Sequence, residues 1–260
     1  MNLIPIRDYV NGCSSYIIGD EISGKAMVID PLRSIGHKNY VISAAKERLY
    51  IEVVVDTHVH ADHYSAAREL AEEIGIHVSM SENAPNDFQF NKLWDGQVIS
   101  LGNLEIVVMH ALGHTPDNLA LKIIDRSRSS EVVSVFTGDS LFVGDVGRPD
   151  LVYESEEMIK NAINDQYNTI FKKLLVLPDY VEIFPAHSGS SSCGGLFLSP
   201  KFNSTIGYER RFNQFLRVKS FEEFSDMVIK TLKPPPVNAK SIREWNLGKS
   251  IELYRDDSND

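Results

Sequence analysis

Cysteine and tryptophan are scarce in this chain of 260 residues, with two of each. Cys13 and Cys193 alone cannot build a disulfide scaffold or a four-cysteine metal site. Apolar runs stay well short of the roughly 20 residues that a membrane-spanning helix needs. The N-terminus also lacks the basic segment and long apolar stretch of a signal peptide. These features predict a protein of the reducing cytoplasm.

Basic residues are also in deficit, since 26 Lys and Arg face 36 Asp and Glu, giving a formal net charge of −10. General electrostatics therefore disfavours nucleic acid and anionic membranes as partners. The hydrophobic fraction of 43% and the charged fraction of 24% are typical of globular proteins and unlike disordered chains or coiled coils. At roughly 100–200 residues per domain, the length allows one large domain or two small ones.

Short apolar runs and helical spacings alternate along the chain. Runs rich in β-branched residues predict strands over 13–19, 25–30, 50–55, 97–101, 104–109, 119–124, 132–136 and 181–184. Apolar residues three and four apart predict helices over 35–48, 64–74, 155–175 and 220–232. Groups of strands with helices between them favour a layered α/β or α+β domain.

Four potential metal ligands lie within six residues directly after the strand that ends at Val55. They are His58, His60, Asp62 and His63, in the pattern H-x-H-x-D-H. Residues two apart on an extended segment project to the same side, so His58 and His60 can face one centre. Asp62 and His63 lie where the chain turns into the next helix and can point back to that centre.

Three single residues extend this set, each just after a predicted strand: His114, Asp139 and His187. Loops at strand ends are common places for functional sites. Imidazole and carboxylate together suit Zn, Fe or Mn better than Ca or Mg. His37, His77 and His110 have no comparable context, and we take them as structural or surface residues.

H-x-H-x-D-H followed by a single His, Asp and His resembles the motif set of the metallo-β-lactamase fold. The resemblance covers most of the chain and implies an αββα sandwich, with two mixed β-sheets face to face and helices outside. It also implies a catalytic domain over 1–218 and a helical extension over 219–260 that packs on it and ends in a frayed tail. The fold hosts hydrolases, nucleases and oxidoreductases, so the motifs alone do not give the reaction.

Sequence around Asp139 resembles one branch of this superfamily. Asp139 replaces the Cys of the common zinc β-lactamases, and His60 and Asp62 disfavour flavodiiron proteins. Residues 138–151 read G-D-S-L-F-V-G-D-V-G-R-P-D-L and resemble persulfide dioxygenases, as do residues 185–194 and 205–210. Ser188 departs from that pattern, where the family usually has Gly. The alternative is a glyoxalase II-like hydrolase of glutathione thioesters.

The dioxygenase resemblance implies one Fe(II) per subunit, held by His58, His114 and Asp139, with Zn as a substitute. His60, Asp62, His63 and His187 would orient the ligands and hold water, with Asp62 or His63 relaying protons. All seven residues could instead hold two metal ions in a hydrolase. In a third interpretation, the chain is a non-catalytic member of the fold.

The implied substrates are O₂ and a small thiol persulfide, such as one of glutathione or coenzyme A, with sulfite and the free thiol as products. Arg148, Tyr208, Arg210 and Arg211 are candidates to bind this anion. For Arg148 the alternative is an ion pair with Asp145 or Asp150, and for Arg210 and Arg211 a solvated helix face. Cys193 is either a persulfide acceptor or a structural residue. The oligomeric state is open, with a homodimer as one option.

Overall fold

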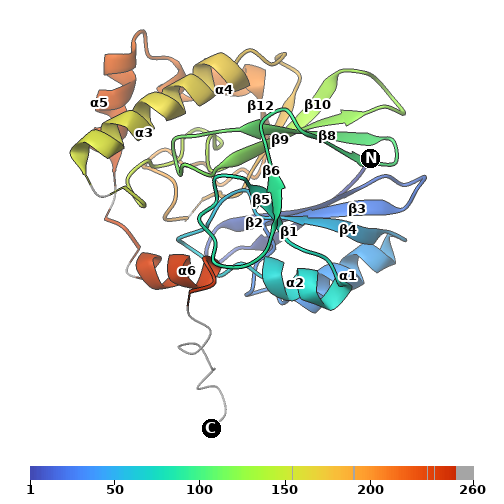
Figure 1. The fold of residues 1–260 in the computed structure, drawn as a ribbon. Coiled ribbons are helices and arrows are strands. Elements are labelled where there is room, and N and C mark those ends of the chain that lie inside the picture. The colour runs from blue at the N-terminus through green and yellow to red at the C-terminus, as the bar shows by residue number, and fades with distance from the viewer. Residues whose placement is uncertain (154, 190, 233, 237, 250–260) are drawn as a thin grey trace.

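The computed structural model describes residues 1–153, 155–189, 191–232, 234–236 and 238–249. Two sheets lie face to face, with helices on the outer side of each (Figure 1). The predicted αββα sandwich of two mixed sheets is therefore confirmed. The tail that was expected to fray, 250–260, lies outside the described residues. Among these residues no helix is both long enough and apolar enough to span a membrane.

The first sheet has six strands in sequence order. They are β1 (Asn2–Asp8), β2 (Cys13–Gly19), β3 (Lys25–Ile29), β4 (Tyr50–Val55), β5 (Ser79–Ser81) and β6 (Asn91–Leu93). β1, β2 and β3 pair antiparallel, whereas β3 to β6 run parallel. Helices α1 (His37–Lys46) and α2 (Ala67–Ile74) cover its outer face (Figure 1).

The second sheet has the order β12-β11-β10-β9-β8-β7. Its strands are β7 (Val98–Leu101), β8 (Leu104–His110), β9 (Leu119–Asp125), β10 (Val132–Gly138), β11 (Glu182–Pro185) and β12 (Ser204–Thr205). Only β10 and β11 pair in parallel. Its outer side carries α3 (Glu156–Asn168), the π-helical turn η1 (Thr169–Leu174), α4 (Ile206–Phe212), the short helix η2 (Gln214–Leu216) and α5 (Phe221–Thr231).

Three apolar clusters hold these layers together. Tyr16, Met27 and Phe136 belong to the cluster between the sheets. Ile163 and Phe224 belong to the cluster beneath α3 and α5. A third cluster lies beneath α1 and α2. Burying apolar surface on both faces of each sheet explains why the buried strands read as nearly continuous apolar runs.

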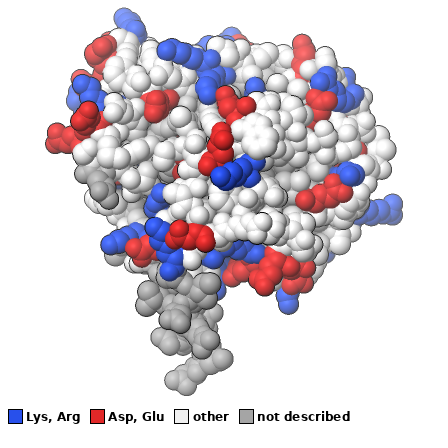
Figure 2. Space-filling model, in the orientation of Figure 1, with Lys and Arg blue, Asp and Glu red and all other residues white. Residues whose placement is uncertain are grey.

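The C-terminal segment contacts both sides of the sandwich. Phe224 and Val228 place α5 in the cluster beneath α3. Helix α6 (Ala239–Asn246) lies beside the first sheet, and Leu247 directly after it joins the cluster of α1 and α2. Figure 1 shows the chain passing from α5 at one layer to α6 at the other. One face of the molecule carries interspersed acidic and basic side chains (Figure 2).

Two predicted helices differ from the structure at an end. The helix expected over 64–74 begins at Ala67, because the Ser65 side chain accepts from the backbone N–H of Ala67 and donates to Asp56. The helix expected over 155–175 is α-helical only to Asn168 and then widens to a π-helical turn, where Thr169 donates to the carbonyl of Leu112. Strand β1 and the short strands β5, β6 and β12 were not predicted.

Asp20 joins the turns at one end of the two sheets. Its carboxylate accepts from the backbone N–H groups of Ser23 and Asn103, at 3.1 Å each. Burial alone would raise the pKa of Asp20, but these hydrogen bonds outweigh it and lower the pKa from 3.8 to about 2. The carboxylate therefore stabilises the fold above pH 4, and this contribution disappears as the pH falls toward 2.

We expect Asp20→Ala to lower the free energy of unfolding by about 2 kcal/mol at pH 7. The difference from the wild type should shrink steadily between pH 4 and pH 2. Denaturant unfolding at several pH values measures both effects. Glu21→Ala is the control, because that exposed neighbour should have little effect. A loss that does not depend on pH would contradict the assignment.

Candidate metal centre

All predicted ligands lie just beyond the ends of strands, at one edge of the sandwich. His58, His60, Asp62 and His63 follow β4, and His114 follows β8. Asp139 comes directly after β10, and His187 lies two residues beyond β11. The sandwich thus brings together seven side chains that span 130 positions of sequence.

His58, His114 and Asp139 form the first group of donors, and their ligand atoms lie within 4.8 Å of one another. The carboxylate Oδ2 of Asp139 is 3.3 Å from Nε2 of His114 and 3.9 Å from Nε2 of His58. All three residues are buried. Two imidazoles and one carboxylate are a donor set that Fe(II) and Zn both accept.

His60, Asp62, His63 and His187 form a second group within the same limit of 4.8 Å. Asp62 links this group, with Oδ1 at 3.1 Å from Nδ1 of His63 and Oδ2 at 3.3 Å from Nε2 of His187. Asp139 lies between the two groups, because its Oδ1 is 3.3 Å from Nε2 of His187. The structure therefore brings all seven predicted residues together.

Several buried polar atoms at this edge have no hydrogen-bond partner among the residues that the structure describes. They are Nε2 of His58, Nδ1 of His60, Nε2 of His63, both nitrogens of His187 and both carboxylate oxygens of Asp139. Unpaired buried polar atoms are destabilising and rare in native proteins. A bound metal ion would satisfy them, so the residues fit the metal that the motifs imply.

Neighbouring groups fix which imidazole nitrogen faces the centre. Nδ1 of His58 lies 3.1 Å from the hydroxyl of Thr57, and Nδ1 of His114 donates to the carbonyl of Arg148 at 2.7 Å. Nε2 of His60 lies 3.1 Å from Oδ1 of Asp30. These contacts leave Nε2 of His58 and His114, and Nδ1 of His60, to bind metal.

Burial sets the protonation states of the metal-free centre. It lowers the pKa of His114 and of His187 to about 4, and it lowers the pKa of His58 well below 6.5. These imidazoles are therefore neutral at pH 7 with a lone pair available. Burial opposes charge on Asp62 and His63 as well, but each stabilises the other, so the pKa of Asp62 falls and that of His63 rises.

Residues that the sequence analysis missed support these ligands. Asp30, at the end of β3, accepts from the backbone N–H and the hydroxyl of Thr57 and contacts His60. Asp117 accepts from the backbone N–H of Val59 at 2.7 Å. An acidic residue immediately after an apolar strand, as at Asp139, was the available signal for Asp30.

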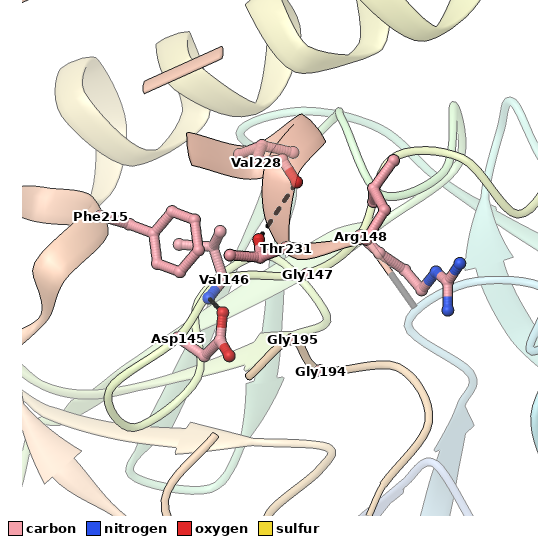
Figure 3. A pocket seen from close by; sticks show the side chains of 10 residues that line it. Asp145, Val146, Gly147, Arg148, Gly194, Gly195, Phe215, Val228 and Thr231 are labelled. Carbon is pink, nitrogen blue, oxygen red and sulfur yellow. Dashed lines mark hydrogen bonds between the residues drawn. The ribbon is translucent and has the colours of Figure 1, made fainter. Parts of the chain in front are cut away.

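Arg148 is buried and already bound on several sides. Its guanidinium forms two hydrogen bonds of 2.8 Å with Asp150 and also donates to the carbonyls of Ser192 and Pro234. Figure 3 shows this side chain directed away from Phe215 and Val228. The cavity that these residues line holds about 10 Å³, enough for one water and too small for a thiol substrate.

The other substrate-binding candidates lie on α4. Tyr208 is exposed, its ring packs at a tilt against Phe212, and it lies beneath the ammonium group of Lys201. Arg210 pairs with Asp179 and donates to the carbonyls of Leu175 and Leu177, while Arg211 is exposed. The contacts of Arg210 join α4 to the segment after η1.

Both cysteines are buried beside the predicted ligands. Cys13 Sγ lies 3.7 Å from Oδ2 of Asp62, and Cys193 groups with Asp139 and His187. Burial raises the pKa of Cys13 to about 11 and also raises that of Cys193, so both are thiols at pH 7 in the metal-free protein. Ser188 is accommodated in the loop after His187 because the left-handed position there is Gly189, with φ of 60°.

Comparison with known families gives one match over most of the chain. The model of the metallo-beta-lactamase superfamily matches residues 8–187. A mitochondrial persulfide dioxygenase ETHE1 from Bos taurus is 29% identical over 226 residues, covering 85% of this chain and 78% of the relative. The hydroxyacylglutathione hydrolase GloC of Haemophilus influenzae is 28% identical over 244 residues, covering 85% of this chain and 99% of that protein.

Solved structures show the same similarity. A metallo-beta-lactamase from Staphylococcus aureus superposes with a TM-score of 0.88 at 28% identity, covering 98% of this chain and 75% of that one. ETHE1 from Myxococcus xanthus superposes with a TM-score of 0.79 at 25% identity, covering 96% of this chain and all of the other.

Proposed function

Because this chain belongs to the metallo-β-lactamase superfamily, whose members are mostly metal-dependent enzymes, we propose that it is a persulfide dioxygenase. It oxidises the persulfide of a small thiol, such as glutathione persulfide, with O₂ and water to sulfite and the free thiol. Similarity to ETHE1 proteins in both sequence and structure supports this choice within the superfamily.

One observation carries the proposal: His58, His114 and Asp139 form their own group of convergent donors. A facial set of two histidines and one carboxylate leaves coordination positions free for substrate and oxygen in non-haem iron enzymes. Iron bound there would supply the redox chemistry with O₂.

The protein's own residues position the ligands and handle protons. Asp139 and the two histidines would hold the metal, and Thr57 and the carbonyl of Arg148 orient the imidazoles. Asp62 and His63 form a carboxylate–imidazolium pair beside them, so His63 can give a proton to, or take one from, water or the released thiol. Of the binding candidates, Arg211 and Tyr208 keep exposed side chains, on α4 at the outer side of the second sheet.

A second candidate is a hydrolase of glutathione thioesters with two metal ions. The group of His60, Asp62, His63 and His187 favours it, because that group could hold a second ion. The similarity to hydroxyacylglutathione hydrolases supports it as well. Two metal ions held by these seven residues would supply an activated water for attack on the thioester carbonyl.

Oxygen uptake distinguishes the two candidates. The iron-loaded protein should consume O₂ when glutathione persulfide is added and should release sulfite. The same preparation, and a zinc-loaded one, should be tested for hydrolysis of S-D-lactoylglutathione. Thioester hydrolysis without oxygen uptake by protein that contains iron would reject the dioxygenase and support the hydrolase.

A further inference from the structure

The loop that carries the H-x-H-x-D-H motif depends on other parts of the chain for its backbone hydrogen bonds. From Asp56 to Tyr64 the chain forms neither helix nor strand, although most of it is buried. The backbone N–H and C=O groups of a buried irregular segment must form hydrogen bonds with groups outside the segment. Unpaired buried groups would destabilise the fold. The groups that pair them therefore decide where the ligand side chains point.

Asn246, the last residue of α6, supplies two of these hydrogen bonds and a third to Ser65, directly after the loop. Its Nδ2 donates to the carbonyls of His60 and His63, each at 2.9 Å. Its Oδ1 accepts from the backbone N–H of Ser65 at 3.0 Å. The side-chain amide is buried and is 181 or more positions away from its partners in sequence. The side-chain amide of Asn246 therefore holds the backbone on both sides of Asp62.

Arg243, three residues earlier and on the same side of α6, contacts the other part of the loop. Its Nη1 donates to the carbonyl of Val59 at 3.2 Å. Asp117 binds the N–H of that residue, so both backbone groups between His58 and His60 are held by side chains. Asp117 and Arg243 also attract each other electrostatically.

Aromatic and apolar contacts fix α6 in this position. The Trp245 ring lies edge-on to Tyr64 and beneath the guanidinium groups of Arg33 and Arg68. Leu247 packs into the cluster under α1 and α2. The helix is therefore seated against the first sheet, at the far end of the segment that leaves α5 (Figure 1).

We propose that α6 is a clamp for the metal centre: Asn246 and Arg243 position the ligands of the H-x-H-x-D-H loop by binding its backbone. Both are positioning residues, since their contacts are to the loop backbone and not to a reacting group. This role goes beyond the proposed reaction and is the same for a dioxygenase and a hydrolase, because both need the loop.

Metal affinity tests the clamp without using enzyme activity. The full-length wild type, Asn246→Ala, Asn246→Asp and Arg243→Met are stripped of metal, and Zn²⁺ affinity is measured by competition with a chelator. We expect Asn246→Ala to bind Zn²⁺ about 10- to 100-fold more weakly. Asn246→Asp should not restore binding, because a carboxylate cannot donate to the two carbonyls. Lys240→Ala, an exposed change on the same helix, should bind as the wild type does.

Two further readouts separate positioning from stability. The Co²⁺-substituted variants should show altered d–d absorption, which reports ligand geometry. Circular dichroism identifies the temperatures at which each variant is folded, and the metal measurements are made at those temperatures. If Asn246→Ala does not fold, Arg243→Met provides the test, because it removes one hydrogen bond to the loop and the attraction to Asp117. Wild-type Zn²⁺ affinity and Co²⁺ spectra in folded variants would overturn the proposal, even if their melting temperatures fall. Absence of oxygen uptake would leave this result unchanged.

Discussion

Asp139→Ala is expected to abolish the metal-dependent activity while leaving the metal-free fold at least as stable. The carboxylate lies between the two donor groups, within 3.3 Å of both His114 and His187. Removing it deletes a donor on which both groups converge. We expect metal affinity and activity to fall at least about 100-fold. Loss of a residue that only supports a ligand costs up to about 100-fold, and loss of the ligand itself should cost at least as much.

The second part of this prediction is that metal-free Asp139→Ala is at least as stable as the metal-free wild type. Burial, with the nearby charges of Asp62 and Asp30, raises the pKa of Asp139 well above 3.8, and within the described part of the chain neither carboxylate oxygen has a hydrogen-bond partner. An unpaired buried polar group is destabilising by about 1–3 kcal/mol. Its removal should therefore offset the small cavity that alanine leaves, so the melting temperature of metal-free protein should not fall.

Metal analysis by mass spectrometry and thermal unfolding measure the two effects on the same samples. Asp226→Ala, an exposed aspartate change on α5, is the control and should alter neither. An Asp139→Ala protein that retains iron and activity would show that Asp139 is not a ligand.

Gly147→Ala is the second change with a large expected effect. A Cβ at this position would lie 1.8 Å from the backbone carbonyl oxygen of Asp139 and 3.5 Å from Cβ of His114. Because the first of these atoms belongs to the backbone, a side chain cannot rotate away to relieve the clash. The strand that carries Asp139 and the loop that carries Gly147 must separate, which moves a predicted ligand.

A displacement of about 1 Å at a reacting centre can lower a rate about 100-fold. Overpacking a buried position also typically destabilises by about 1–3 kcal/mol. We therefore expect Gly147→Ala to lose both metal affinity and stability, in contrast to Asp139→Ala, which loses only the first. Chelator competition and denaturant unfolding distinguish the two patterns.

Gly195→Ala is the matched control for this change. It also lies at an ordinary φ in the same region, but its Cβ would meet the Asp145 side chain at 3.0 Å, which can adjust by a few tenths of an ångström. The effect should be clearly smaller. Equal losses in the two variants would mean that the contact with the Asp139 backbone is not the cause.

The sequence alone determined the candidate ligands and, through the resemblance of their motifs to the metallo-β-lactamase fold, the layers of the fold. Apolar runs predicted eight of the strands near their observed bounds, because strands buried on both faces must be apolar along their length. The seven His and Asp residues stood out because they follow strands, where the sandwich gathers loops at one edge. The spacing of these residues can be read from the sequence without the structure.

Tertiary structure decided how these residues are held and which neighbours are engaged. Asp30 and Asn246 hold the ligand loop from positions far away in sequence. The motif around Arg148 allowed either substrate binding or an ion pair, and the structure shows the ion pair with Asp150. Hydrogen bonds between segments that are distant in the sequence produce no recognisable spacing of residues. They exist only because the packing of two sheets and α6 brings buried backbone groups to side chains that can satisfy them.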